Sequence, residues 1–153
     1  MLVVLDIDGV LANCDHRLHY LNEKDYDSFY SEEEMLKDEP IKEGLELLEI
    51  LLDNWEVELY LMTGRPYRTE DTTRKWLARQ RQDFGELIMI MRKNRDYRPS
   101  DEVKLENMLK MEKLMNKDRD DSILFIDDDL KNVQAVEKGC GKVKGILFGT
   151  SRL

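Results

Sequence analysis

Two aspartates separated by one residue follow the first apolar run of the chain, in the sequence Leu5-Asp6-Ile7-Asp8-Gly9. A carboxylate can act as a nucleophile that accepts a phosphoryl group and so forms an aspartyl-phosphate. A second carboxylate two residues further on can protonate the leaving oxygen and then activate water. The pair therefore fits phosphoryl transfer, with Asp6 as the nucleophile and Asp8 as the acid and base.

A second acidic pair, Asp127 and Asp128, follows another apolar run late in the chain. If the fold gathers these side chains beside Asp6 and Asp8, the four carboxylates repel one another and raise one another's pKa. A hard divalent cation removes this conflict, and Mg²⁺ takes one or two carboxylates together with water and substrate phosphate. We therefore expect Mg²⁺ as the cofactor, with these four aspartates as the candidate ligands.

Thr63 and Lys104 supply the hydroxyl and the cation that neutralise charge on a transferred phosphoryl group. Each candidate also has a simpler explanation. Asp8 suits a turn at the end of a strand, Asp129 suits the cap of the next helix, and Lys104 suits a solvated surface. Thr63-Gly64 suits a turn, with Pro66 at the first position of a helix. Each of these explanations is credible alone. Because all the candidates fall at corresponding places in the predicted fold, a shared site explains them better than separate structural roles.

Strand and helix patterns alternate along the chain. Continuous apolar runs of strand length occupy residues 2–7, 57–62, 87–91, 122–126 and 143–148, and they indicate parallel strands buried on both faces. Helix-period segments lie between them at residues 41–52, 69–82, 103–115 and 130–138. This alternation predicts an α/β fold, a doubly wound, Rossmann-like and mostly parallel sheet with helices on both faces. Ligands of such sheets bind beyond the carboxyl ends of the strands, where the candidate residues fall.

The 153 residues suit one domain over residues 1–153, because no repeat or linker divides them. The segment 13–40 is longer than an ordinary connection between a strand and a helix, and it is polar and aromatic. Since it follows the acidic motif directly, we expect a small helical flap over the site, with an Ω-type surface insertion as the alternative.

The net charge of −9 argues against binding nucleic acid through many phosphates, but it leaves room for a small basic pocket. No apolar run approaches the roughly 18 residues of a membrane span, and no basic leader precedes the first strand. Two distant cysteines, Cys14 and Cys140, indicate reduced thiols. We expect a soluble, cytoplasmic protein with a phosphorylated substrate, no membrane association and no stable protein partner.

The ordered motifs resemble the haloacid dehalogenase (HAD) superfamily of phosphohydrolases over nearly the whole chain. The DxDG motif of that superfamily is matched at residues 6–9, and Thr63, Lys104 and the pair Asp127-Asp128 follow in its order. The resemblance implies a HAD-like fold with a minimal cap inserted after the first strand. It also implies an Mg²⁺-dependent phosphatase.

The same resemblance implies a role for each matched residue. Asp6 is then the nucleophile and a metal ligand, and Asp8 is the acid and base that also offers its backbone carbonyl to Mg²⁺. Thr63 and Lys104 hold the phosphoryl group. Of the acidic pair, Asp128 touches the metal directly, whereas Asp127 acts through water or through the lysine.

A narrower resemblance is to the 3′-phosphatase domains of phage polynucleotide kinase/phosphatases. The matched positions are Arg17, Gly64-Arg65, residues 73–76 (Thr-Arg-Lys-Trp) and residues 101–104 (Asp-Glu-Val-Lys). They imply substrate binding by Arg17, Gly64 and Arg65. Ser100 departs from the pattern, since that family can carry an acidic residue there. The phosphate-binding loop of a kinase half is absent from the sequence.

These features favour removal of a 3′-phosphate from nucleic-acid ends or nucleotides. Arg92, Arg95 and Arg98 with Tyr97 form a basic and aromatic cluster that suits stacking on a base and holding a phosphodiester, and a solvated loop is the alternative. One rival function is a phosphatase for a small metabolite, such as a free 5′-nucleotide or a sugar phosphate. A rival of another class is an inactive HAD-like binding module. Phosphoryl transfer to an acceptor other than water also stays open.

Overall fold

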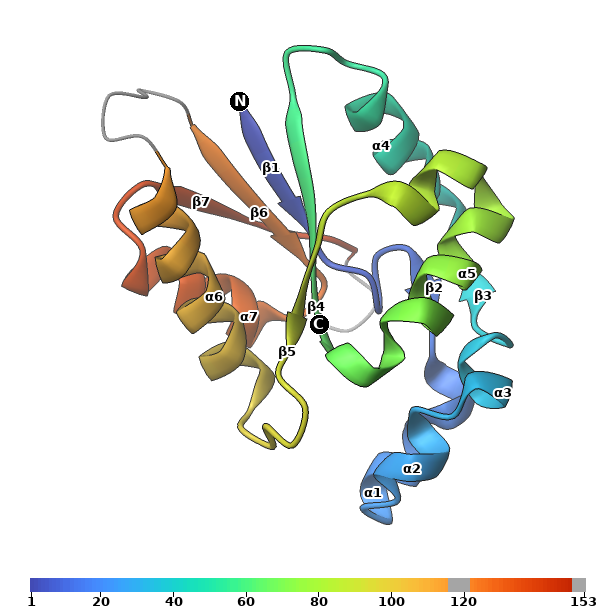
Figure 1. Cartoon of the computed structure of the whole chain (residues 1–153). Coiled ribbons are helices and arrows are strands. Elements are labelled where there is room, and N and C mark those ends of the chain that lie inside the picture. Colours follow the sequence, from blue (N-terminus) through green and yellow to red (C-terminus); the bar gives the residue numbers. More distant parts are fainter. Residues whose placement is uncertain (116–121, 150–153) are drawn as a thin grey trace.

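A parallel sheet of five strands forms the centre of the computed structural model, which describes residues 1–115 and 122–149 (Figure 1). The strands are β1 (Leu2–Leu5), β4 (Glu58–Pro66), β5 (Met89–Arg92), β6 (Ile123–Asp127) and β7 (Val143–Leu147). They lie in the order β5-β4-β1-β6-β7, and every neighbouring pair is parallel. The order reverses direction at β1, so the predicted doubly wound α/β sheet is confirmed.

Helices cover both faces of the sheet. The helices α4 (Lys42–Leu52) and α5 (Glu70–Gln80) lie on one side, and α6 (Ser100–Leu114) and α7 (Leu130–Gly139) lie on the other (Figure 1). Because side chains of a strand alternate between its faces, β1 contributes to two cores. Val3 and Leu5 pack in the core that contains Trp76 of α5, whereas Val4 packs in the core that contains Met108 of α6.

Two segment ends differ from the sequence prediction in ways that matter for the site. The strand predicted at 57–62 continues as β4 to Pro66, and its register with β5 is irregular between Met62 and Pro66. Thr63 therefore lies within the strand and not beyond it. Pro66 has an extended backbone and precedes the 3₁₀ turn η2 (Tyr67–Thr69), so the alternative that placed Pro66 at the first position of a helix is wrong.

The helix predicted at 130–138 extends to Gly139, and Gly139 lies inside it. A Cβ atom at this position would come within 2.5 Å of Cδ1 of Leu105 on α6. The glycine therefore allows α6 and α7 to approach each other closely. This approach helps to place the beginning of α6, where Lys104 lies, beside the carboxyl end of β6.

Residues 13–40 form a chain of short elements between β1 and α4. They are η1 (Asp15–Arg17), α1 (Leu18–Asn22), α2 (Tyr26–Phe29) and α3 (Glu32–Met35). The short strands β2 (Ala12–Asn13) and β3 (Glu39–Pro40) pair in antiparallel fashion, so the two ends of the insertion lie side by side. In Figure 1 the helices α1 to α3 project at the end of the sheet where the strands terminate. The structure thus shows a helical insertion, and its action as a flap stays a prediction.

The remaining regular element is the 3₁₀ helix η3 (Gln82–Glu86), which connects α5 to β5. None of the described helices combines the length and the hydrophobicity that crossing a membrane requires. The organisation of residues 1–153 as one domain stays a prediction, and its segments 116–121 and 150–153 lie outside the described residues.

Candidate active site

The carboxyl ends of β1 and β6 and the first turns of α6 meet at Lys104. The ammonium Nζ of Lys104 lies 3.0 Å from Oδ1 of Asp6 and 2.5 Å from Oδ2 of Asp127. Only 2% of Lys104 is exposed, so the alternative of a solvated surface lysine is wrong. The ammonium is instead a buried counter-charge between two strand-end carboxylates, and these contacts raise its pKa against the opposing effect of burial.

Asp6 follows directly on β1 and is 4% exposed. Its Oδ1 accepts a hydrogen bond of 2.8 Å from the backbone N–H of Ile7 as well as the contact from Lys104. Burial raises the pKa of Asp6 well above its ordinary value, and the nearby Asp127 raises it further, while Lys104 opposes both. The carboxylate is thus fixed in orientation but carries an electrostatic conflict that one lysine does not remove.

Asp127 is fully buried and heavily bonded. Its Oδ1 accepts from the backbone N–H of Asp129 at 2.9 Å and from Nδ2 of Asn132 at 3.2 Å, in addition to the lysine contact on Oδ2. The side chain of Asp129 accepts from the N–H of Lys131 and caps α7, so the helix-cap explanation holds for that one aspartate. In this acidic run Asp129 therefore caps a helix, whereas Asp127 belongs to the site.

The group formed by Asp6, Asp127 and Asp128 suits a hard divalent cation. One carboxylate oxygen from each of the three lies within 4.8 Å of the other two. Gly9 makes room for this arrangement, since its φ is +84° and a Cβ atom there would lie 1.9 Å from Oδ2 of Asp128. Both oxygens of Asp127 already accept hydrogen bonds, so Asp127 is suited to support a cation site through Lys104 and Asn132. Mg²⁺ bound here would offset the mutual repulsion of the carboxylates and neutralise phosphoryl oxygens.

Mg²⁺ is expected to raise the melting temperature of the wild-type protein by several degrees. A hundredfold excess over the Kd stabilises a folded protein by about 2.7 kcal/mol, and each kcal/mol shifts Tm by roughly 2–4 °C at this size. Asp128→Asn removes a ligand charge and should abolish most of the shift, as measured by differential scanning fluorimetry. Asp129→Asn is the matched control, because asparagine also caps helices. An equal shift in all three proteins would remove Asp128 from the metal site.

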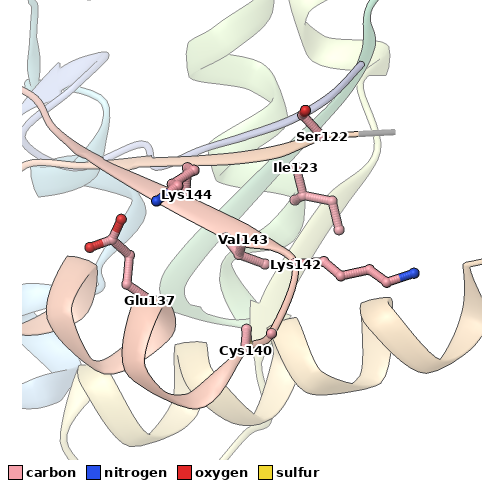
Figure 2. Close-up of a pocket in the computed structure, with 8 residues that line it drawn as sticks. Ser122, Ile123, Glu137, Cys140, Lys142, Val143 and Lys144 are labelled. Carbon is pink, nitrogen blue, oxygen red and sulfur yellow. The ribbon is translucent and has the colours of Figure 1, made fainter. Parts of the chain in front are cut away.

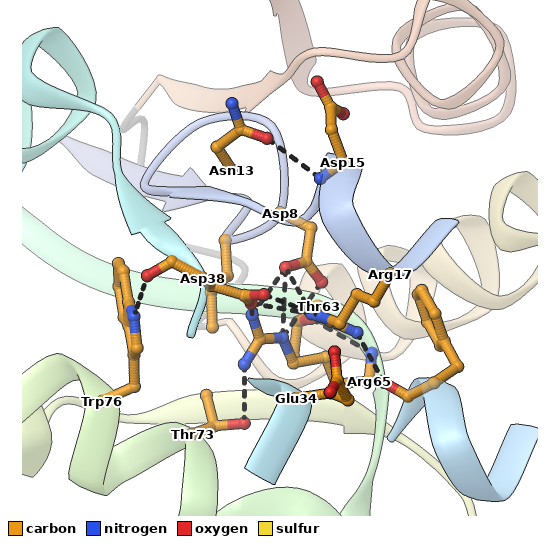
Figure 3. Close-up of polar contacts among 12 residues, drawn as sticks. Asp8, Asn13, Asp15, Arg17, Glu34, Asp38, Thr63, Arg65, Thr73 and Trp76 are labelled. Carbon is orange, nitrogen blue, oxygen red and sulfur yellow. Dashed lines mark hydrogen bonds and ion pairs between the residues drawn. The ribbon is translucent and has the colours of Figure 1, made fainter. Parts of the chain in front are cut away.

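Asp8 lies in a second cluster, which we call the arginine–aspartate network and which consists of Asp8, Arg17, Asp38 and Arg65 (Figure 3). Arg65 grips Asp8 with Nη2 at 2.6 Å from Oδ1 and Nε at 3.0 Å from Oδ2. Arg17 donates to Asp38 from Nε and Nη2, both at 2.8 Å. Arg65 also reaches Asp38 at 2.9 Å, so the two pairs are joined.

The network balances two positive and two negative side chains, and only Asp8 is partly exposed, with 27% of its side chain open to solvent. Arg17, Asp38 and Arg65 are each less than 5% exposed. Burial alone would raise the pKa of Asp8, but the charge and hydrogen bonds of Arg65 outweigh it and hold that pKa below its ordinary value. Asp8 is therefore ionised, and its carboxylate is kept in one position by the arginine fork.

Arg17 and Arg65 were predicted to clamp the substrate, but the structure does not place their guanidinium groups on an open surface. Arg17 also donates to the carbonyl of Phe29 at 3.0 Å, and its guanidinium carbon lies 4.4 Å from the centre of that ring. Its Nη2 also lies 3.4 Å from Oδ1 of Asp8, so Arg17 ties the insertion to that residue. Arg65 also reaches the hydroxyl of Thr73 at 3.2 Å. The geometry favours a positioning role for both, and direct substrate contact stays a prediction.

Thr63 and Gly64 lie in the irregular last part of β4, beside β1. The hydroxyl oxygen of the fully buried Thr63 accepts from the backbone N–H of Arg65 at 3.1 Å. The hydroxyl oxygen thus accepts from Arg65, and its proton can be donated to another acceptor. The carbonyl of Gly64 accepts from Nε of Arg92 at 2.8 Å, so this predicted contact residue is anchored by its backbone.

Two site residues escaped the sequence interpretation. Asp38 is one acid among several near the end of the insertion, and no spacing distinguishes it from its exposed neighbours. Asn132 lies in the first turn of α7, shortly after the acidic pair, and this position was the available signal in the sequence. Its amide Nδ2 donates to both carboxylate oxygens of Asp127, at 3.2 Å each.

A separate pocket lies at the other end of the sheet (Figure 2). It is lined at the amino ends of β6 and β7 and the end of α7, by residues that include Ile123, Cys140 and Val143. Parallel sheets of this class bind ligands beyond the carboxyl ends of their strands. This pocket is therefore not part of the candidate active site.

The fold is that of the haloacid dehalogenase-like hydrolases, as the motifs predicted. A hydrolase of the haloacid dehalogenase-like family from Streptococcus pneumoniae superposes with a TM-score of 0.64 at 13% identity, over 95% of this chain and 83% of that one.

Chains of two solved Pnkp1/Rnl/Hen1 complexes share the fold as well. One superposes with a TM-score of 0.68 at 18% identity, over 95% of this chain and 45% of that one. The other belongs to a complex described as an RNA repair complex. It superposes with a TM-score of 0.66 at 20% identity, over 96% of this chain and 42% of that one. The chain thus spans less than half of these neighbours. No family model matches the sequence, and no curated protein matches it.

Proposed function

We propose that the chain is an Mg²⁺-dependent phosphomonoesterase of HAD type that works through an aspartyl-phosphate on Asp6. The observation that carries the proposal is the position of Lys104. Its ammonium lies between Asp6 and Asp127, at the strand ends where a phosphoryl group would meet both the nucleophile and a bound cation. A binding module has no need of a buried lysine beside a buried carboxylate, so the geometry favours chemistry over the rival of an inactive module.

The first step is in-line attack of a carboxylate oxygen of Asp6 on phosphorus, with departure of the ester oxygen. Lys104 and the hydroxyl of Thr63 bind the transferred oxygens, while the N–H of Ile7 keeps the carboxylate oriented. Water then cleaves the acyl phosphate, which releases phosphate and restores Asp6. Transfer to an acceptor other than water uses the same first step.

Asp8 serves as the proton carrier of both steps. The ionised state that Arg65 enforces is the form that accepts a proton from attacking water. Donation to the leaving oxygen requires Asp8 to take up a proton first, and weakening of the Arg65 fork when phosphate enters would permit this. Asp8 is also proposed to offer its backbone carbonyl to Mg²⁺.

We propose a 3′-phosphate on a nucleic-acid end or a nucleotide as the substrate. The insertion at 13–40 is small, and a short cap leaves a polymer end access to Asp6, whereas a large cap would exclude it. The likeness to a chain of an RNA repair complex supports the same direction. The net charge of −9 is the observation that favours the rival, a phosphatase for a small metabolite. A cytoplasmic location and the lack of a stable protein partner stay predictions.

A comparison of kcat/KM with Mg²⁺ over four substrates tests the proposal. The panel is a 3′-phosphorylated oligonucleotide, a 3′-mononucleotide, a 5′-mononucleotide and a sugar phosphate. We expect the 3′-phosphorylated oligonucleotide to be preferred, because its neighbouring nucleotides add binding energy that the small substrates lack. A preference for the sugar phosphate would establish the small-metabolite rival, and turnover of none of the four would defeat the phosphatase proposal itself.

A further inference from the structure

Tyr97 is an exposed aromatic residue held in a fixed position at the catalytic end of the sheet. It lies in the loop between β5 and α6, and 71% of it is exposed. Nη1 of Arg92 donates to the carbonyls on both sides of it, at 3.0 Å to Asp96 and 2.6 Å to Arg98. One side chain therefore fixes the turn that presents the tyrosine.

The same arginine connects this turn to the phosphoryl-binding part of β4. Nε of Arg92 donates to the carbonyl of Gly64, the residue after Thr63. Arg92 therefore links the backbone beside Thr63 to the turn that carries Tyr97.

Two arginines at this loop, Arg92 and Arg98, bond to other groups of the protein. Arg98 pairs with Asp96 at 2.8 Å and also contacts Glu106, and Arg92 bonds to the carbonyls described above. The predicted grip of these arginines on a phosphodiester is thus weakened, since they already have partners. The loop presents the ring of Tyr97 to solvent together with the exposed Lys93, Asn94 and Arg95.

A second tyrosine supports that ring from the insertion. The ring of Tyr26 on α2 lies 5.4 Å from the ring of Tyr97, centre to centre, at 45°. Nearby, the guanidinium carbon of Arg68 lies 5.5 Å from the ring centre of Tyr30. The insertion and the rim of the sheet therefore meet through aromatic contacts, and Tyr97 is backed on one side and open to solvent on the rest.

We propose that Tyr97, backed by Tyr26, is a stacking platform for the terminal base of a single-stranded substrate whose 3′-phosphate lies at Asp6. The proposal rests on the proposed phosphatase function. A preorganised aromatic face binds any base, because every base has a π-face. An unpaired end is the matching substrate class, since its terminal base is free to turn onto the ring, whereas a paired terminal base is held in place by its hydrogen bonds and by stacking on the neighbouring pair.

Two 3′-phosphorylated single-stranded oligonucleotides test the platform, one complete and one without its terminal base. They carry the same charge, so the ratio of their kcat/KM values reports the base alone. Tyr97→Ala is expected to lower this ratio roughly 5- to 150-fold, the range of one base–aromatic stack. Tyr97→Phe should keep the ratio near the wild-type value. Trp55→Ala is the matched control, because Trp55 is 90% exposed and precedes β4 at the opposite end of the sheet.

Equilibrium binding of the same two oligonucleotides separates the two proposals. If no phosphomonoester is hydrolysed, the phosphatase function fails, and the binding ratio still reports the platform. If turnover occurs but Tyr97→Ala leaves both ratios at the wild-type value, the platform is refuted while the phosphatase stands. A fall equal to that of Trp55→Ala refutes it as well. Thermal unfolding of each variant verifies that the exposed substitutions leave the fold intact.

Discussion

Asp6→Asn is expected to lower phosphate release by roughly 10⁴-fold or more, on the scale of removing a nucleophile. The amide keeps the shape of the side chain but cannot form an acyl phosphate. The fold should persist, because the substitution removes a buried charge that lies beside Asp127 and whose pKa is raised chiefly by burial. The measurement is phosphate release from an aryl phosphate with Mg²⁺, beside a thermal unfolding curve.

A covalent readout separates the nucleophile from the proton carrier. Acid quenching with a ³²P-labelled substrate should leave label on the wild-type protein and none on Asp6→Asn. Asp8→Asn should slow turnover yet still accept label, since Asp6 is intact. Asp129→Asn makes the same chemical change at the cap of α7 and should behave as the wild type. Surviving activity in Asp6→Asn would remove Asp6 as the nucleophile.

The part of the site built on the sheet was predictable from the sequence. Asp6 and Asp127 follow continuous apolar runs, and parallel strands bring their carboxyl ends together whatever the connections are. Lys104 followed from the helix pattern after β5. The positions of these residues depend on strand order and local pattern, and the hydrophobic periodicity of the chain indicates both.

The part of the site built on the insertion was not predictable in the same way. The role of Asp38 depends on how 13–40 folds back on β4, and nothing in the sequence separates Asp38 from nearby acids such as Glu33 and Glu39, which are exposed. Arg17 was identified as a site residue, but its burial against Phe29 and Asp38 was not. The end of β4 at Pro66 depends on an irregular register with β5, which no local pattern reports. Tertiary contacts decided each of these features.

The largest effect on stability is expected from Asp38→Ala, which breaks the contacts between the insertion and β4. Asp38→Ala leaves Arg17 and Arg65 buried with Asp8 as their shared carboxylate, and 27% of the Asp8 side chain is open to solvent. Breaking one partner of a buried ion pair costs about 3–5 kcal/mol, a large share of the roughly 5–15 kcal/mol that keeps a domain folded. Trp76 bonds to the backbone carbonyl of Asp38, so that bond survives the substitution. Urea denaturation followed by tryptophan fluorescence measures the loss.

Asp53→Ala is the control, because Asp53 forms an exposed pair with Arg81 at 2.8 Å and such pairs contribute little to stability. A loss in Asp38→Ala no greater than in the control would show that the arginine–aspartate network does not hold the insertion. The double variant Arg17→Met/Asp38→Ala removes an unpaired buried charge that the single variant leaves behind. It should therefore be less destabilised than the sum of its single variants, and strict additivity would mean that Arg17 and Asp38 act independently.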